Sequence, residues 1–401
     1  MPSSLTWLDV SADQQRRVRE IIRLFEEPGT RDELGVGPIR DSFSDQLFPG
    51  TSVIQTRARY FLFVPWLFQA ASARGRRGQD MLDRVDRSER QLIERFRAAG
   101  LTDGLIGRQA GARVKILPST IYWGGLTRWG VLTAPMTPKA VAETGRSTDS
   151  EEDELAFRSV GPWHPTMPPA PTGFPNAESG GFDLTPAEAQ WLYERVEDRV
   201  PGTLLAHLVA GDALSETDAP WLEPVALAAP AAIAELLEHA RRFSLLVHGA
   251  ALLYNLLAAE RYEQQGFTRL DDPSGWYRDA LDVWSTEYRD HIGSEWDWPR
   301  FWDVVRTGNP RVPPGARAFV ENWEEGVRRC GGPSQVADDD GMRDLVRGRV
   351  ARLRGSRAVL GNDKLLATWG GSSGSSALVY RWGTVRQLVI DIQEALTRAG
   401  S

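Results

Sequence analysis

The sequence predicts a mainly α-helical, multi-helical protein, and three observations support this fold class. Apolar residues recur at helical spacing, as Val18, Ile21, Ile22 and Phe25 do near the start of the chain. No alternation of strand and helix patterns occurs, and runs of β-branched residues are few. Proline, glycine and small polar residues stand between the apolar segments, where helices begin and end.

The N-terminal part is expected to hold four helices, at residues 11–25, 39–47, 53–73 and 80–98. Ser11 and Asp13 are candidate N-caps for the first of them. The third is apolar on nearly every face and contains Pro65. Because proline lacks the backbone N–H and restricts the preceding residue, we expect this helix to kink or break near Val64.

A possible helix-turn-helix or winged-helix element is expected near residues 88–133. Here the 80–98 helix is followed by glycine-containing turns and then by Pro118-Ser119, a good start for another helix. That last helix carries Tyr122, Trp123 and Arg128. A plain helical subdomain has the same pattern, so both interpretations stay open.

The second half of the chain continues the helical pattern, with helices expected at 186–196, 223–262, 276–291, 298–306, 315–329, 342–354 and 384–398. Thr185 in TPAE is the expected N-cap of the first. Pro230 should interrupt the second. Its later part, 243–262, is apolar almost all round and should be the central buried helix of its module.

The composition of the sequence divides the chain into four expected segments, residues 1–133, 134–182, 183–335 and 336–401. The first is a helical module, and the second is an acidic linker or insertion rich in Pro and Gly. That second segment includes the run TDSEEDE and cannot pack a core on its own. The third is an acidic, Trp-rich helical module, and the fourth is a basic helical segment.

Composition places the chain among ordinary soluble proteins, with 41% hydrophobic and 25% charged residues. No run of 18 or more apolar residues occurs, and the start of the chain lacks the pattern of a signal peptide. The single Cys330 rules out a disulfide within one chain. A cytoplasmic protein without a membrane partner is therefore expected.

The net charge of −7 is unevenly distributed along the chain. Counting Lys and Arg against Asp and Glu gives 20 against 15 in residues 1–133, 17 against 32 in 134–335, and 10 against 7 in 336–401. Basic ends thus flank an acidic middle. Such asymmetry favours an anionic partner at the ends, although a solvated surface gives the same count.

Nucleic-acid binding is the best-supported function class, because arginine makes bidentate contacts with phosphate and guanine. DNA or RNA is the expected partner. Arg108 belongs to the basic residues around the helix that starts at Pro118. The residues expected to bind are Arg57, Arg59, Arg113, Lys115, Arg128, Arg347 and Arg354.

The leading interpretation, a nucleic-acid-binding protein, includes no catalytic, metal-binding or cofactor-binding residue. The five histidines form no HExxH or HxxxH pair, and no GxxxxGK[ST] loop occurs. The run GGSSGSS is interpreted as a flexible hinge or a tight loop, not as the nucleophile elbow of a hydrolase. The alternative is a hydrolase or nuclease that uses Asp32, Asp41 and Asp45. Arginines such as Arg40 bound to these carboxylates would instead indicate a structural network.

Three stretches resemble landmarks of a bacterial family of unknown function, the domain-of-unknown-function family numbered 6361. They are RDELGVGPIRDSFSDQLFPGTSVIQTRARYFLFVPW, IYWGGLTRWGV, and YRW followed by a helix containing Asp391-Ile392. The resemblance implies a soluble bacterial protein, sometimes encoded near helicase-like or nuclease-like defence genes. It therefore suggests an anti-phage complex, with such a protein as partner, and it assigns no catalytic residue.

Overall fold

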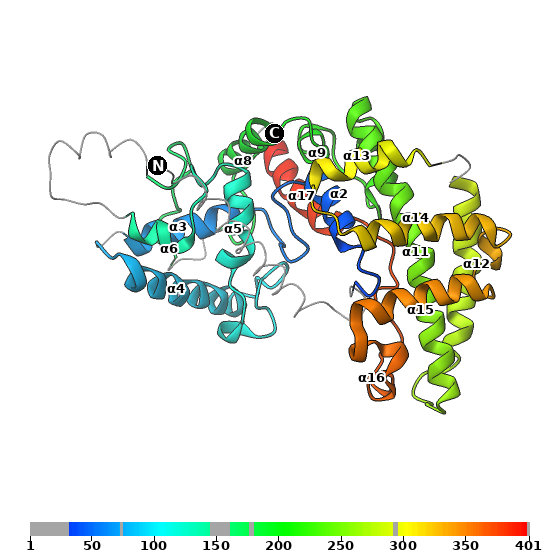
Figure 1. Ribbon diagram of the computed structural model, residues 1–401. Coiled ribbons are helices and arrows are strands. Elements are labelled where there is room, and N and C mark those ends of the chain that lie inside the picture. The colour runs from blue at the N-terminus through cyan, green and yellow to red at the C-terminus, as the bar shows by residue number, and fades with distance from the viewer. Residues whose placement is uncertain (1–31, 73–74, 145–160, 176–179, 292–295, 399–401) are drawn as a thin grey trace, which may run out of the picture. The chain divides into compact units, whose positions relative to one another are not determined.

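The computed structural model describes residues 32–72, 75–144, 161–175, 180–291 and 296–398 (Figure 1). Within these residues the regular structure is helical, apart from one isolated bridge between Leu132 and Trp163. The mainly α fold class is therefore confirmed. The helix expected at 11–25 and the TDSEEDE run lie outside the described residues.

The contacts divide the chain into two compact units. Of the described residues, those within 47–233 and 381–398 form unit 1, and those within 32–46 and 234–380 form unit 2. Each unit is therefore assembled from segments that are far apart in the sequence. The boundaries expected at 133, 182 and 335 stay predictions.

The helices of unit 1 are α3 (Tyr60–Ser72), α4 (Gly78–Ala98), α5 (Pro118–Arg128), α6 (Pro138–Glu143), α8 (Pro186–Arg199), α9 (Leu204–Ala210), α10 (Pro224–Leu227) and α17 (Trp382–Thr397), with 3-10 turns η2 (Gly111–Arg113) and η3 (Pro220–Leu222). The apolar helix α3 is buried along most of its length and packs against α4 and α5. The C-terminal helix α17 packs against α8 and α9. Thr185 forms the expected N-cap of α8, in a full capping box with Glu188.

Helix α3 begins at Tyr60, so the start expected at residue 53 is wrong. The N–H groups of Thr56 and Arg57 donate to the Tyr122 hydroxyl at 2.8 and 3.1 Å, and the N–H of Ala58 donates to Asp391 at 2.8 Å. These distant partners hold the backbone outside the helix. Although Pro65 lies inside α3, the helix continues to its end, so no break occurs near Val64.

Helix α5 begins at Pro118, as expected, but the helix-turn-helix element is not shown. Between α4 and α5 the described chain contains only turns and the 3-10 turn η2. Tyr122, Trp123 and Leu126 are buried, so much of α5 faces the core of unit 1.

The helices of unit 2 are α2 (Gly37–Leu47), α11 (Ala231–Gln264), α12 (Pro273–His291), α13 (Trp298–Gly308), α14 (Pro314–Arg329), α15 (Asp340–Arg354) and α16 (Asp363–Ala367), with 3-10 turns η4 (Pro333–Gln335), η5 (Gly355–Arg357) and η6 (Val359–Gly361). α2 ends, and α11 begins, at the border with unit 1. The indole N–H groups of Trp284 and Trp323 donate to backbone carbonyls of α11 at 2.8 and 2.9 Å. Gly249 allows this packing, because a Cβ there would lie 2.2 Å from the Trp284 ring.

By length and composition alone, α11 could cross a membrane. However, 78% of its most apolar window is buried inside the structure. Such burial is typical of the core helix of a soluble protein, and a central buried helix was expected at 243–262.

Candidate nucleic-acid interface

The carboxylates of Asp32 and Asp41 have partners close to them in the sequence. Asp32 accepts hydrogen bonds from the N–H groups of Val36 at 2.9 Å and Gly37 at 2.8 Å, at the N-terminus of α2. Arg40 donates to Asp41 through Nε at 3.1 Å and a terminal nitrogen at 2.9 Å. The pair of Arg40 and Asp41 is of the kind expected for a structural network and not for a hydrolase or nuclease site.

Nothing in the described part of the chain adds a metal-binding group to these carboxylates. No cluster of three or more His, Cys, Asp or Glu residues able to hold a metal ion occurs there. Asp45 also has an interaction partner. His248 lies 3.1 Å from the carbonyl of Ser375, and burial lowers its pKa. His248 is therefore a hydrogen-bonded histidine of the core.

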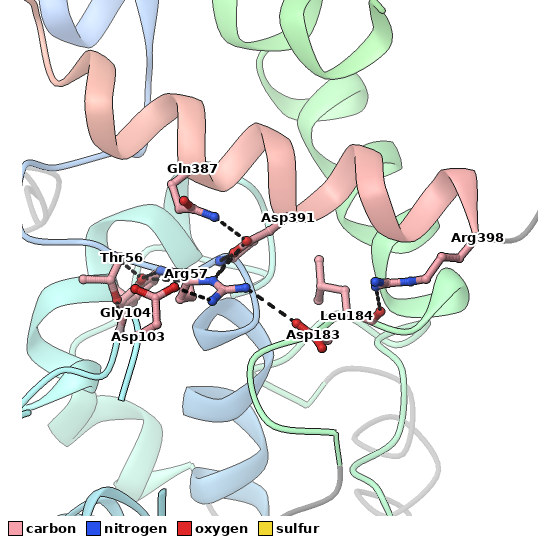
Figure 2. Close-up of polar contacts among 11 residues, drawn as sticks. Thr56, Arg57, Asp103, Gly104, Asp183, Leu184, Gln387, Asp391 and Arg398 are labelled. Carbon is pink, nitrogen blue, oxygen red and sulfur yellow. Dashed lines mark hydrogen bonds and ion pairs between the residues drawn. The ribbon is translucent and has the colours of Figure 1, made fainter. Parts of the chain in front are cut away.

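Arg57 lies at the centre of a polar network in unit 1 (Figure 2). Its Nε is 3.0 Å from both carboxylate oxygens of Asp391 on α17. Asp391 also accepts hydrogen bonds from the N–H of Ala58 and, at 2.8 Å, from Gln387. The side chain of Asp391 is only 2% exposed. The network thus joins the start of α3 to α17.

Two further carboxylates lie near the same guanidinium, those of Asp103 at 3.5 Å and Asp183 at 3.7 Å (Figure 2). Burial alone would lower the pKa of Arg57, but its hydrogen bond and ion pair with Asp391 and these two charges outweigh burial and raise it. The positive charge of Arg57 is therefore matched inside the protein.

Arg59 is buried more completely, with a relative exposure of 1%. It donates to Glu188 at 2.9 Å and to the carbonyl of Gly181 at 2.9 Å. Glu188 in turn belongs to the capping box of α8. A phosphate could reach this guanidinium only by displacing Glu188, so burial favours a structural role.

The two candidate arginines on α15, in unit 2, also have acidic partners. Arg347 forms an exposed pair with Asp344 at 3.1 Å, one turn away. Arg354 donates to Glu33 at 3.0 Å and to the carbonyl of Asp32 at 2.7 Å. Arg354 therefore fixes the segment that precedes α2, whereas Arg347 could exchange a weak surface pair for another anion.

Arg113, Lys115 and Arg128 are the remaining candidates, and all three are exposed. Nearby Arg108 is exposed as well. Within the described residues, the side chains of these four have no hydrogen-bond or ion-pair partner. Their charges are therefore free for a ligand.

These four residues belong to a stretch without acids, residues 104–142, which we call the cationic segment. It contains no Asp or Glu, and its basic residues are Arg108, Arg113, Lys115, Arg128 and Lys139. The absence of acids from this stretch can be seen in the sequence. The charge count over 1–133 did not reveal it, because that count averages the stretch with the acidic residues before it.

Helix α4 holds the loop of the cationic segment in place. Glu94 accepts a hydrogen bond from the N–H of Ala112 at 2.6 Å. Arg90 donates to the carbonyl of Val114 at 3.1 Å and to that of Ala112. The backbone on both sides of Arg113 is thus fixed before any ligand arrives, which lowers the entropy cost of binding.

Glu89 of α4 holds the end of this loop, where α5 begins. Its carboxylate accepts hydrogen bonds from the N–H of Ser119 at 2.7 Å and from its hydroxyl at 2.8 Å. Burial raises the pKa of Glu89 to about 7. Sequence reasoning missed Glu89, Arg90 and Glu94, although their spacing puts them on neighbouring turns of one amphipathic helix.

Comparison with known proteins decides the family. A model of the family of unknown function DUF6361 matches residues 2–395. The chain belongs to this family. No curated protein and no solved structure matches it. The description of the DUF6361 family names no activity.

Proposed function

We propose that this DUF6361 protein binds nucleic acid, without catalysis, through the cationic segment. The observation that carries the proposal is a set of exposed side chains in a stretch without acids, which have no partner among the residues that the structure describes. They are those of Arg108, Arg113, Lys115 and Arg128. Lys and Arg in such a group neutralise phosphates and release their counterions.

The net charge of −7 does not argue against this binding. At physiological ionic strength, charges farther apart than about 8 Å are largely screened. Phosphates on the loop would therefore respond mainly to nearby charges, and those within residues 104–142 are all positive. The acids Asp86 and Glu94 of α4, which lie beside the loop, are paired with Arg90 and Arg97.

The expected mode is contact with the sugar-phosphate backbone and not readout of base sequence. Helix α5 buries Tyr122, Trp123 and Leu126 in unit 1, so these side chains are not available to a groove. The loop presents separate positively charged side chains on a fixed backbone, and these can contact phosphates. Because contacts to phosphates carry no direct sequence information, no preference for a base sequence is expected.

The test is a mobility-shift titration over a salt series, with one duplex and one single strand of unrelated sequences. The triple variant Arg108→Ala, Arg113→Ala, Lys115→Ala should weaken binding about tenfold or more at low salt. On the duplex, the slope of log K against log salt should become shallower by about 0.9 for each phosphate that the variant no longer neutralises.

Arg311→Ala is the matched control, because Arg311 is an exposed arginine of unit 2 whose side chain has no partner among the described residues. It should leave affinity and slope unchanged. Absence of binding to either strand form at low salt would refute the proposal. A loss confined to Arg347→Ala would move the interface to α15.

We further propose that the protein acts in the bacterial cytoplasm as a scaffold in an anti-phage complex, with a helicase-like or nuclease-like partner. This part rests on the family resemblance and not on geometry. Purification from the native host, with and without nuclease treatment, checks it. A defence protein that stays bound after the nucleic acid is digested is the expected result, and its absence would count against the scaffold.

A further inference from the structure

A second surface of unit 1 has the opposite character to the cationic segment. Leu222 and Leu227 are 55% and 64% exposed, which is unusual for leucine. Pro224, Ala228 and Pro230 are exposed beside them in the chain. We call these five residues the apolar patch. A group of exposed apolar side chains of this kind often marks a binding site.

Glu223 interrupts the apolar run in the sequence but not on the surface. It is 0% exposed. Its carboxylate accepts hydrogen bonds from the N–H of Ser215 at 3.1 Å, from the hydroxyl of Thr217 at 3.4 Å and from the N–H of Val225 at 3.4 Å. The one acid between the two leucines is thus turned inward, and the patch itself presents no charge.

The support beneath the patch is fixed to α17. The indole N–H of Trp382 donates to the carbonyl of Thr217 at 2.9 Å. Arg386 donates to the carbonyl of Ser215 at 2.7 Å, and Gln393 to that of Asp212 at 2.9 Å. Because the loop that holds Glu223 is anchored in this way, a partner would meet a preorganised surface.

The loop that is hydrogen-bonded to Glu223 is acidic. Residues 200–240 contain no Lys or Arg. Asp212, Glu216 and Asp218 are exposed on the loop bonded to Glu223, and Arg386 is the one cation bonded to that loop among the described residues. The exposed charges of this loop are therefore mainly negative.

We infer that the apolar patch docks a protein partner through a segment in which apolar side chains are flanked by Lys or Arg. Charge complementarity selects this occupant, because like charges facing each other across an interface are costly. A second copy docked patch to patch would oppose acid to acid. Nucleic acid and anionic lipid are repelled for the same reason.

The test uses the full chain and a synthetic helical peptide of Leu, Lys and Ala, with its leucines on one face. Fluorescence anisotropy should show binding with a Kd below about 1 mM, which corresponds to a binding free energy of about −4 kcal/mol. A peptide with Glu in place of Lys, and one with Ala in place of Leu, should bind at least tenfold more weakly.

Two variants of the protein locate the binding. Leu222→Ser with Leu227→Ser, and separately Glu216→Lys with Asp218→Lys, should each weaken peptide binding tenfold or more. Because all four side chains are exposed, the variants should keep the wild-type Tm. Leu353→Ser is the control, since Leu353 is also an exposed leucine, at 42%, and belongs to unit 2.

Three results would overturn the inference. The first is that the wild-type protein does not bind the peptide. The second is that each of the two double variants binds the peptide as tightly as the wild type does. The third is self-association of the wild type in sedimentation velocity that is lost in the variant Leu222→Ser with Leu227→Ser. The last would make a second copy the occupant. None of these results involves the cationic segment, so the proposal of nucleic-acid binding is tested independently.

Discussion

Two groups of basic residues in unit 1 share their chemistry and differ in their surroundings. Arg57 and Arg59, at the start of α3, are held by Asp391 and Glu188. Arg113 and Lys115, on the loop between α4 and α5, are exposed and have no side-chain partner among the described residues. The first pair stabilises the fold, whereas the second keeps its charge available to a ligand.

The difference shows that the number of arginines in a stretch does not reveal where an anion binds. What matters is whether the fold also brings a carboxylate to each guanidinium. The same contrast holds for acids, since Glu223 is turned inward while Glu216 stays exposed beside it. Four predictions test the contrast, from the largest expected effect to the smallest.

The largest effect is expected for Arg59→Met. It leaves Glu188, which is 4% exposed, as a buried carboxylate without its cation. Breaking a buried pair from one side typically costs about 3–5 kcal/mol, and urea unfolding at pH 7 measures the loss. The double variant Arg59→Met, Glu188→Gln should regain much of it, because Gln can keep the capping box. A loss below about 1 kcal/mol for the single variant would show that Arg59 is not held as described.

Glu89→Gln tests the support beneath the cationic segment. Because the pKa of Glu89 is raised to about 7 in the folded protein, its proton is bound more tightly there than in the unfolded chain. The free energy of unfolding should therefore fall as the pH rises from about 5 to 8, by roughly 2–3 kcal/mol from this group.

The glutamine variant should lack that decline, since its amide can accept from the Ser119 N–H and donate to the Ser119 hydroxyl. Urea unfolding at several pH values compares the two proteins. An equal decline in both would mean that Glu89 is not the titrating group.

Asp391→Asn should be the third effect in size. It removes the charge that Arg57 faces while keeping one acceptor oxygen, and a loss of about 2 kcal/mol is typical of a buried charged hydrogen bond. Asp103→Asn is the matched control, because the side chain of Asp103 is 95% exposed and such pairs contribute about 0–1 kcal/mol. Thermal unfolding that ranks the two variants the other way would contradict the network of Figure 2.

The smallest effect on stability is expected for Arg113→Ala with Lys115→Ala. Exposed side chains without partners usually change stability by no more than about 0.5 kcal/mol. Differential scanning calorimetry should give a nearly unchanged Tm, while nucleic-acid affinity falls. A clear loss of stability would erase the contrast with Arg57 and Arg59.

Much of the helical framework could be predicted because its signals are local. Thr185 and Glu188 form their capping box three residues apart, Pro118 begins α5, and Pro230 separates α10 from α11. The start of α3 could not be found in this way. It depends on Tyr122 and Asp391, which are far away in the sequence.

The candidate interface was predictable only in part. Arg113, Lys115 and Arg128 were among the residues expected to bind, but Arg57, Arg59 and Arg354 were grouped with them on the same grounds. Composition cannot separate these groups, because an exposed arginine and a buried one look alike in a sequence.

Most helix positions, the cap of α8 and the absence of acids from 104–142 follow from the chain alone, since they depend on neighbours within a few residues. Packing decided which charges remain free. The partner of Arg59 lies 129 residues away and that of Arg57 lies 334 residues away. Only a folded chain brings groups so distant within the roughly 3 Å at which a carboxylate engages a guanidinium.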